Sequence, residues 1–137
     1  MSDVPDPPTA SQARHIRRRL FERVADADTS HLCVAADAGE WQPFGRGVRI
    51  KVLHEADGVM SYLLRMEPGS CLPPHRHPEV EETLVVEGEI RVGTHAVEGP
   101  GSYQRAAVGS LHATTTTQTG ALLFVRAASP SVEQLLG

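Results

Sequence analysis

Apolar residues in most of the chain recur with the period of a β-strand. Residues 48–54, VRIKVLH, alternate apolar and polar side chains, which predicts a strand. Asp57 and Gly58 follow as a predicted hairpin turn, and residues 59–66 return as the partner strand. Many short strands without intervening helices predict an antiparallel barrel or sandwich. Further strands of this kind are expected at 90–92, 102–105, 111–117 and 121–127.

One segment near the start follows a helical period instead. Ser11 is predicted to cap a helix that runs to about Ala27. Its apolar residues fall three and four positions apart and make one stripe, formed by Ala13, Ile16, Leu20, Val24 and Ala27. Arginines cover much of the remaining surface, at 14 and 17–19. They fit either a basic arm for nucleic acid or an acidic partner, or the solvated face of a helix packed on a barrel or on a second subunit. Because the rest of the chain is acidic, we favour the packed helix and expect no nucleic-acid partner.

Composition excludes several broad classes of protein. The 137 residues, 40% hydrophobic and 22% charged, suffice for one domain with a hydrophobic core. A net charge of −4 gives no general attraction to nucleic acid or membranes. Cys33 and Cys71 form no CxxC pair, and a reducing cytoplasm is the expected compartment. Residues 1–10 lack the features of a signal peptide, and the longest apolar run, 121–125, is too short to span a bilayer. We therefore expect no membrane association.

Residues 69–88, GSCLPPHRHPEVEETLVVEG, hold the candidate chemistry. His75 and His77 stand one residue apart, so a strand would send both to the same face, roughly 6–7 Å apart. Glu81 follows four positions later and could reach the same ion. Imidazole nitrogens and a carboxylate oxygen suit Zn, Fe, Ni, Cu and Mn. A His-x-His pair alone is commonly just solvated, and it is the surrounding sequence that favours a metal site here.

That surrounding sequence favours extended chain and tight turns. Pro73 and Pro74 impose an extended approach to the histidines, and Pro78 excludes a helix after them. Residues 87–88, Glu-Gly, are predicted to make a tight turn between the apolar runs LVV and IRV. The whole segment is thus predicted to run from strand through metal ligands into a hairpin.

The spacing of these residues resembles the first motif of the cupin superfamily, which places two histidines and a glutamate between the glycines Gly69 and Gly88. A second cupin motif delivers a third histidine, and Gly101, Gly109 and His112 stand where the family places them. Ala107 and Thr116 replace the usual proline and asparagine. The resemblance implies an all-β fold, a small double-stranded β-barrel of the jelly-roll type. It also implies one divalent transition metal per chain, Zn or Fe(II) with Ni, Mn or Cu as further options, held by His75, His77, Glu81 and His112.

The segment PGSYQRAAVGSLH, followed by TGALLFVRA, is most similar to the cupin domain of ChrR-type anti-sigma factors. The chain then divides into a disordered tail at 1–10, the helix and an edge strand at 11–37, the cupin barrel at 38–128 and a tail or short helix at 129–137. The sigma-binding domain of that family carries a His-x3-Cys-x2-Cys zinc motif that this sequence lacks, so a sigma factor is not an expected partner. A homodimer is expected, because cupins usually pair and the helical stripe needs a surface to cover it.

Strand parity suggests which other side chains reach the centre. Glu81 and Glu82 are neighbours and must face oppositely, and the motif spacing selects Glu81 as the ligand. Cys71 shares the parity of the two histidines. The remaining candidates for the pocket come as two pairs that each share a face of their strand, Tyr62 with Met66 and Tyr103 with Arg105.

Two functions fit these features. The resemblance to ChrR favours a module that binds or senses a small ligand at a His3Glu centre. The same four ligands also resemble those of Fe(II)-dependent cupin dioxygenases that act on a small diketone or hydroxyketone. Fold and ligands are shared among many functions, so whether the protein is an enzyme stays open at this point.

Overall fold

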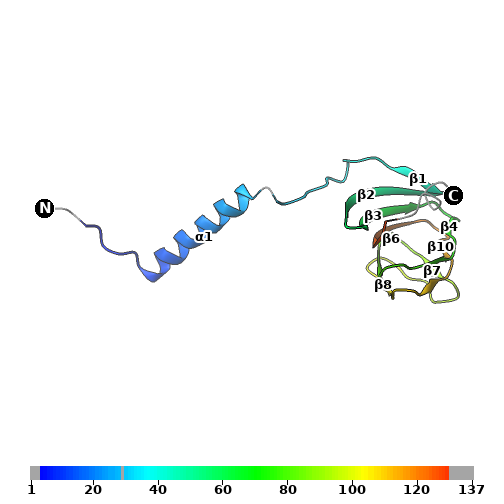
Figure 1. Cartoon of the computed structure of the whole chain (residues 1–137). Coiled ribbons are helices and arrows are strands. Elements are labelled where there is room, and N and C mark those ends of the chain that lie inside the picture. The colour runs from blue at the N-terminus through cyan, green and yellow to red at the C-terminus, as the bar shows by residue number, and fades with distance from the viewer. Residues whose placement is uncertain (1–3, 29, 130–137) are drawn as a thin grey trace. The chain divides into compact units, whose positions relative to one another are not determined.

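The described residues, 4–28 and 30–129 of the computed structural model, form one helix and eleven strands (Figure 1). The chain divides into two units, Met1–Ala35 with the helix and Ala36–Gly137 with the strands. The short helix expected after residue 129 falls outside the described residues, as does part of the tail expected at 1–10. No helix of the described chain is long and apolar enough to cross a membrane.

The helix α1, Ala10–Ala27, begins at a complete capping box. The Thr9 hydroxyl accepts a hydrogen bond from the Gln12 amide, and the Gln12 side chain accepts one from the Thr9 amide. The cap is therefore Thr9 and not the predicted Ser11. The predicted apolar stripe is present but lies open, since no residue of α1 is buried and Ile16 and Leu20 are 57% and 61% exposed.

The edge strand expected within residues 11–37 does not form: residues 31–36, which follow the helix and alternate apolar and polar side chains, contain no strand in the structure. Alternation there is weak, and the first strand of the described residues begins at Gln42.

The main sheet has six antiparallel strands in the order β1-β2-β3-β11-β6-β8. Asp57 and Gly58 join β2 to β3 with φ of 53° and 76°, as a two-residue mirror-image turn requires, so the predicted hairpin is confirmed. The bounds of the six strands are β1 Gln42–Gly45, β2 Val48–Ala56, β3 Val59–Met66, β11 Ala121–Ala128, β6 Glu81–Gly88 and β8 Tyr103–Ala106.

Five shorter strands form two further sheets. One has the order β4-β10-β7, made of Cys71–Leu72, Thr115–Thr116 and Arg91–Val92. The other pairs β5, His75–Arg76, with β9, Leu111–His112. The sheets remain separate ladders in the described chain and do not close into one, while the predicted all-β class with an N-terminal helix is confirmed.

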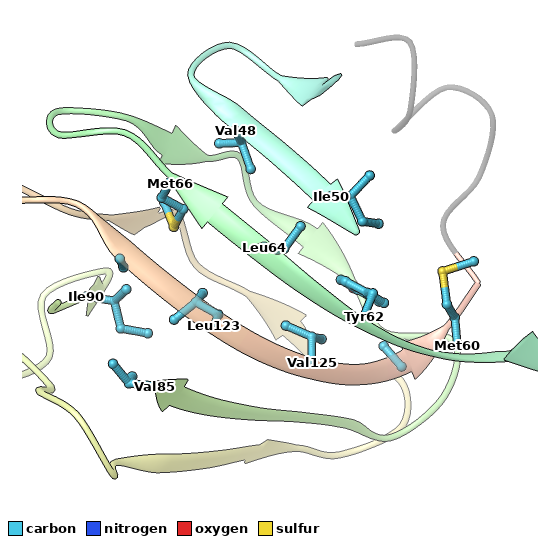
Figure 2. Close-up of a cluster of buried hydrophobic side chains, with 12 residues drawn as sticks. Val48, Ile50, Met60, Tyr62, Leu64, Met66, Val85, Ile90, Leu123 and Val125 are labelled. Carbon is cyan, nitrogen blue, oxygen red and sulfur yellow. The ribbon is translucent and has the colours of Figure 1, made fainter. Parts of the chain in front are cut away.

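The core covers one face of the six-stranded sheet (Figure 2). Burial alternates along β3 with a period of two, so that Tyr62, Leu64 and Met66 face inward. Leu123 and Val125 of the neighbouring β11 join them. Burying each large aliphatic side chain contributes about 1.5–3 kcal/mol relative to leaving it in water. Part of this apolar face also lines the cavity beside the candidate site.

Residues 87–88 do not form the predicted hairpin turn. Strand β6 continues to Gly88, which pairs with Ala121 of β11, and the next residues leave the sheet. Ile90 then bridges to Glu98, and β7 pairs with β10 in the second sheet. The chain therefore turns a corner from one sheet to another here. A glycine followed by a second apolar run does not distinguish such a corner from a hairpin.

The only lysine of the chain, Lys51, is buried on β2. Its side chain is 2% exposed, and its Nζ donates a hydrogen bond of 3.0 Å to the carbonyl oxygen of Ala36. A Cβ on Gly39 would stand 3.2 Å from the Lys51 Cε, so the segment around residues 36–39 lies directly over this side chain.

Glu89 holds the loop that precedes β11. Its Oε1 accepts hydrogen bonds from the Gln118 and Thr119 amides, at 2.8 and 3.0 Å, and from the hydroxyls of Thr119 and Thr117. The Thr119 amide is the largest of the contacts that hold the pKa of Glu89 below its usual range. A charged acceptor at this place stabilises the ordered loop.

We expect Glu89→Ala to lower the free energy of unfolding at neutral pH by about 1–2 kcal/mol, a figure that solvent screening keeps small. Because folding lowers the pKa of Glu89, its contribution is full above the unfolded pKa, about 4.3, and is lost as the pH falls through the folded pKa. Urea unfolding followed by Trp41 fluorescence at several pH values measures this. Glu40→Ala, at an exposed position, is the control, and an equal, pH-independent loss in both variants would contradict the assignment.

Candidate metal centre

Three histidines meet beside the short β5–β9 pair. His75 and His112 are direct partners in the two strands, and their rings stack with centroids 5.0 Å apart. His77 follows β5, and two hydrogen bonds hold its backbone. Its amide donates to the Ser110 carbonyl oxygen at 3.0 Å, and its carbonyl oxygen accepts from the Gly109 amide at 2.7 Å. One nitrogen from each of the three rings lies within 4.8 Å of the others. The pairing of β5 with β9 thus joins two motifs that are far apart in the sequence.

Glu81, the first residue of β6, lies beside two of the three histidines. Its Oε2 lies 3.3 Å from Nε2 of His75 and 3.1 Å from Nδ1 of His77. Ligands about 2.1 Å from one metal ion at tetrahedral or octahedral angles stand about 3.0–3.4 Å apart, so the separation of Glu81 Oε2 from His75 Nε2 suits a shared ion. Glu82 faces the other way, and its Oε1 accepts a hydrogen bond of 2.7 Å from the Tyr103 hydroxyl. The structure therefore places Glu81, and not Glu82, with the histidines.

Backbone carbonyls set the tautomers of two of the histidines. Nδ1 of His75 lies 3.3 Å from the Pro73 oxygen, and Nδ1 of His112 lies 2.7 Å from the Ala113 oxygen. A carbonyl can only accept, so each Nδ1 carries a proton, and in the neutral ring Nε2 keeps the lone pair. In the protonated ring, Nε2 of His75 donates to Glu81 instead. Metal-binding histidines are commonly oriented in this way.

His77 gives an independent indication that the residues fit a metal ion. Its Nε2 is the one buried side-chain nitrogen or oxygen of the described chain that has no hydrogen-bond partner. Leaving such a group unsatisfied is costly, whereas a metal ion in the cluster could be bound by this ring. The donor set of imidazoles and a carboxylate accommodates the first-row divalent metals.

The cluster also sets the charges of its members. The hydrogen bond to Glu81 raises the pKa of His75 against the opposing effect of burial, whereas burial lowers the pKa of His77. Burial also raises the pKa of Glu81, but the hydrogen bond to His75 and the nearby histidines outweigh it and leave that pKa below its usual value. An ionised glutamate and a neutral buried histidine are the forms that can donate electron pairs to a metal.

A cavity of about 840 Å³ opens beside the cluster, and its walls include the three histidines and Glu81. Apolar side chains such as Leu64, Ile90 and Leu123 make much of the remaining wall. Of the pocket residues suggested by the sequence, Tyr62 and Cys71 line this cavity. Burial and the charge of Glu81 both raise the pKa of Tyr62, so its hydroxyl stays protonated at neutral pH.

Met66, Tyr103 and Arg105, the other pocket residues suggested by the sequence, are not among the residues that line this cavity. Met66 shares the inner face of β3 but lies at its far end, 1% exposed within the closed core. Tyr103 is 55% exposed, and its hydroxyl is bonded to Glu82 on the outer face. Arg105 is exposed and stands opposite Glu82 in the β6–β8 register.

The inward residue of β8 is Gln104, which the sequence analysis did not consider. It lines the cavity and pairs with the buried Thr83 of β6. Strand β8 has four residues, Tyr-Gln-Arg-Ala, with polar side chains on both faces, so its orientation cannot be deduced from alternation. Its register against Leu84 decides which face turns inward.

An antiparallel jelly-roll fold whose cavity is lined by three histidines and a glutamate is typical of a cupin. The chain belongs to the family of the ChrR cupin-like domain, whose model matches residues 29–129. A comparison with curated protein sequences finds no match.

Solved structures share the fold. An RmlC-like cupin from Shewanella frigidimarina has a TM-score of 0.64 and 20% identity, covering 75% of this chain and 96% of that chain. The complex of SigE with the anti-sigma factor ChrR from Rhodobacter sphaeroides matches with a TM-score of 0.61 and 20% identity, over 91% and 70%. An acetylacetone dioxygenase from Acinetobacter johnsonii matches with a TM-score of 0.63 and 15% identity, over 95% and 82%. At these identities the likeness concerns the fold alone.

Proposed function

We propose that this protein binds a small organic molecule at a metal centre formed by His75, His77, Glu81 and His112. The observation that carries the proposal is that the four side chains converge at the wall of a cavity of about 840 Å³. A purely structural metal site needs no such space, whereas a centre that receives a ligand does.

The protein's own residues would prepare this centre. The carbonyl oxygens of Pro73 and Ala113 keep Nε2 of His75 and His112 free to bind. Glu81 orients two of the rings, and the apolar wall around Leu64 and Leu123 limits access of water. A divalent metal held there would act as a Lewis acid and polarise an oxygen atom of the bound molecule.

A second candidate function is an Fe(II)-dependent dioxygenase acting on a small diketone or hydroxyketone. The observation that favours it is the apolar wall directly beside a His3Glu cluster, because oxygen chemistry requires open coordination positions in a site shielded from water. The structural likeness to an acetylacetone dioxygenase is consistent with this use of the fold.

Metal analysis of protein purified without a metal-chelating tag tests the proposal. We expect about one equivalent of a first-row divalent metal per chain, either as isolated or after anaerobic loading with Fe(II) or Zn. Absence of stoichiometric metal under every condition would refute a metal centre.

Oxygen uptake by the Fe(II)-loaded protein distinguishes the two candidates. Consumption that depends on an added β-diketone or hydroxyketone would establish the dioxygenase. Tightly held zinc, together with no uptake by the iron form, would favour the binding or sensing module.

A further inference from the structure

Three polar side chains form a row across the inner face of the sheet. In the strand registers Val125 stands opposite both Tyr62 and Thr83, and Thr83 stands opposite Gln104. The row therefore runs through β3, β11, β6 and β8, and Tyr62, Thr83 and Gln104 all line the cavity. Tyr62 and Val125 can be followed side by side in Figure 2. Strands β3, β6 and β8, which are distant in sequence, thus place three hydrogen-bonding side chains in one row on the same face of the sheet.

The polar groups of this row have no partners in the described part of the protein. Tyr62 and Thr83 are only 5% and 8% exposed, yet neither hydroxyl makes a hydrogen bond to any described residue, and neither does the Gln104 amide. Among the described residues, the one fully buried side-chain nitrogen or oxygen without a partner is Nε2 of His77, so the hydroxyl oxygens of Tyr62 and Thr83 are open to the cavity. Water or a ligand in the cavity can therefore form hydrogen bonds with them.

The row lies between the candidate metal centre and the apolar wall. Glu81 precedes Thr83 by two residues on β6, so both face inward about 6–7 Å apart. On the other side, Leu64, Leu123 and Val85 form an entirely apolar row. A molecule that reaches the centre with one oxygen would hold a second oxygen beside the polar row and its hydrocarbon part against the apolar row.

The charges around the row indicate which oxygen it accepts. Tyr62, Thr83 and Gln104 are uncharged, and the charged side chain of their strands that lines the cavity with them is the carboxylate of Glu81. The two arginines of the cavity wall, Arg46 and Arg76, are exposed, and Arg76 already donates to the Gly109 carbonyl. A carboxylate at the row would lose water without gaining a cation, which is unfavourable.

We propose that Tyr62, Thr83 and Gln104 bind a second, uncharged oxygen of the ligand and make this centre selective for neutral oxygenated molecules over carboxylates of the same shape. This inference rests on the proposed function, since the first oxygen is bound at the metal centre. It adds the class of ligand and three residues that determine specificity.

The Co(II)-loaded protein, whose visible spectrum responds to metal ligation, provides the assay. Two matched pairs serve as probes: hydroxyacetone against glycolate, and acetylacetone against acetoacetate. In each pair a methyl ketone is exchanged for a carboxylate of similar size. We expect the neutral member of at least one pair to bind more tightly than its carboxylate. Preference for the carboxylate in both pairs, or binding of none of the four probes, overturns the proposal.

Variants that remove one hydroxyl while keeping the shape locate the effect. Thr83→Val and Tyr62→Phe are each expected to weaken binding of the neutral probe about three- to tenfold, the usual value of one hydrogen bond. Cobalt content should stay at the wild-type level. Tyr103→Phe, which removes a hydroxyl from the outer face, is the matched control and should bind the probe normally.

Two kinds of failure remain distinguishable. If both inner-face variants bind the neutral probe as tightly as the wild type, the polar row is not the recognition element, and the metal centre stands unaffected. If the wild-type protein takes up no stoichiometric metal, the proposed function itself fails.

Discussion

A Gly88→Ala variant is expected to lose about 3–5 kcal/mol of its free energy of unfolding. Gly88 ends β6 with φ of 75°, a conformation that disfavours any side chain. A Cβ at this position would also collide with the backbone oxygen of Gly120 and lie 2.9 Å from the Cα of Ala121. Because the obstacle is backbone of the paired strand, no side-chain rotation can relieve it.

Gly58→Ala separates the two causes of this loss. Gly58 has nearly the same φ, 76°, but a Cβ there would meet nothing within 4 Å. We expect it to lose only the conformational part, about 1–2 kcal/mol. Urea unfolding of both variants and the wild type makes the comparison, and equal losses would show that the contact with Gly120 is unimportant.

Replacing His112 by alanine is expected to lower metal affinity about a hundredfold or more, since even changes to residues behind the ligands commonly cost ten- to hundredfold. His75→Ala should behave alike, because its Nε2 also faces the cluster. Both side chains are partly exposed, so their removal should leave the fold intact. His77 is less suitable for this test, because it is 1% exposed and its loss would also affect packing.

Metal content after dialysis against a fixed concentration of free zinc measures this effect, with circular dichroism as the test of folding. His95→Ala, which removes an exposed histidine, should retain wild-type metal. Stoichiometric metal in the variants at positions 75 and 112 would show that these residues do not form the centre.

Local patterns predicted the long strands well. The alternation of residues 48–54 and the Asp57-Gly58 turn correspond to the β2–β3 hairpin. The alternation and the turn are local in sequence, and the hairpin they form pairs two consecutive segments of the chain. Local patterns are therefore enough to predict it. The meeting of His75 with His112 was implied only by resemblance to cupins, because no local rule connects β5 with β9.

The cavity wall was predicted less well, because it depends on register and on the ends of strands. Parity alone put Tyr103 and Arg105 in the pocket, whereas pairing with β6 turns Gln104 inward. Tyr62 and Met66 share a face of β3, but only one of them reaches the cavity. The corner at Gly88 requires knowledge of the second sheet, to which the chain passes there.

Because Lys51 is buried, chemical modification of its amine would report local opening of the protein around it. It is the chain's single lysine, and its amine is enclosed beneath the segment around Ala36 and Gly39. Acylating reagents such as activated esters react with amines that solvent can reach, so the Lys51 side chain should be modified only when that segment lifts. The rate at which mass spectrometry detects acylated Lys51 would therefore measure how often this part of the sheet is uncovered.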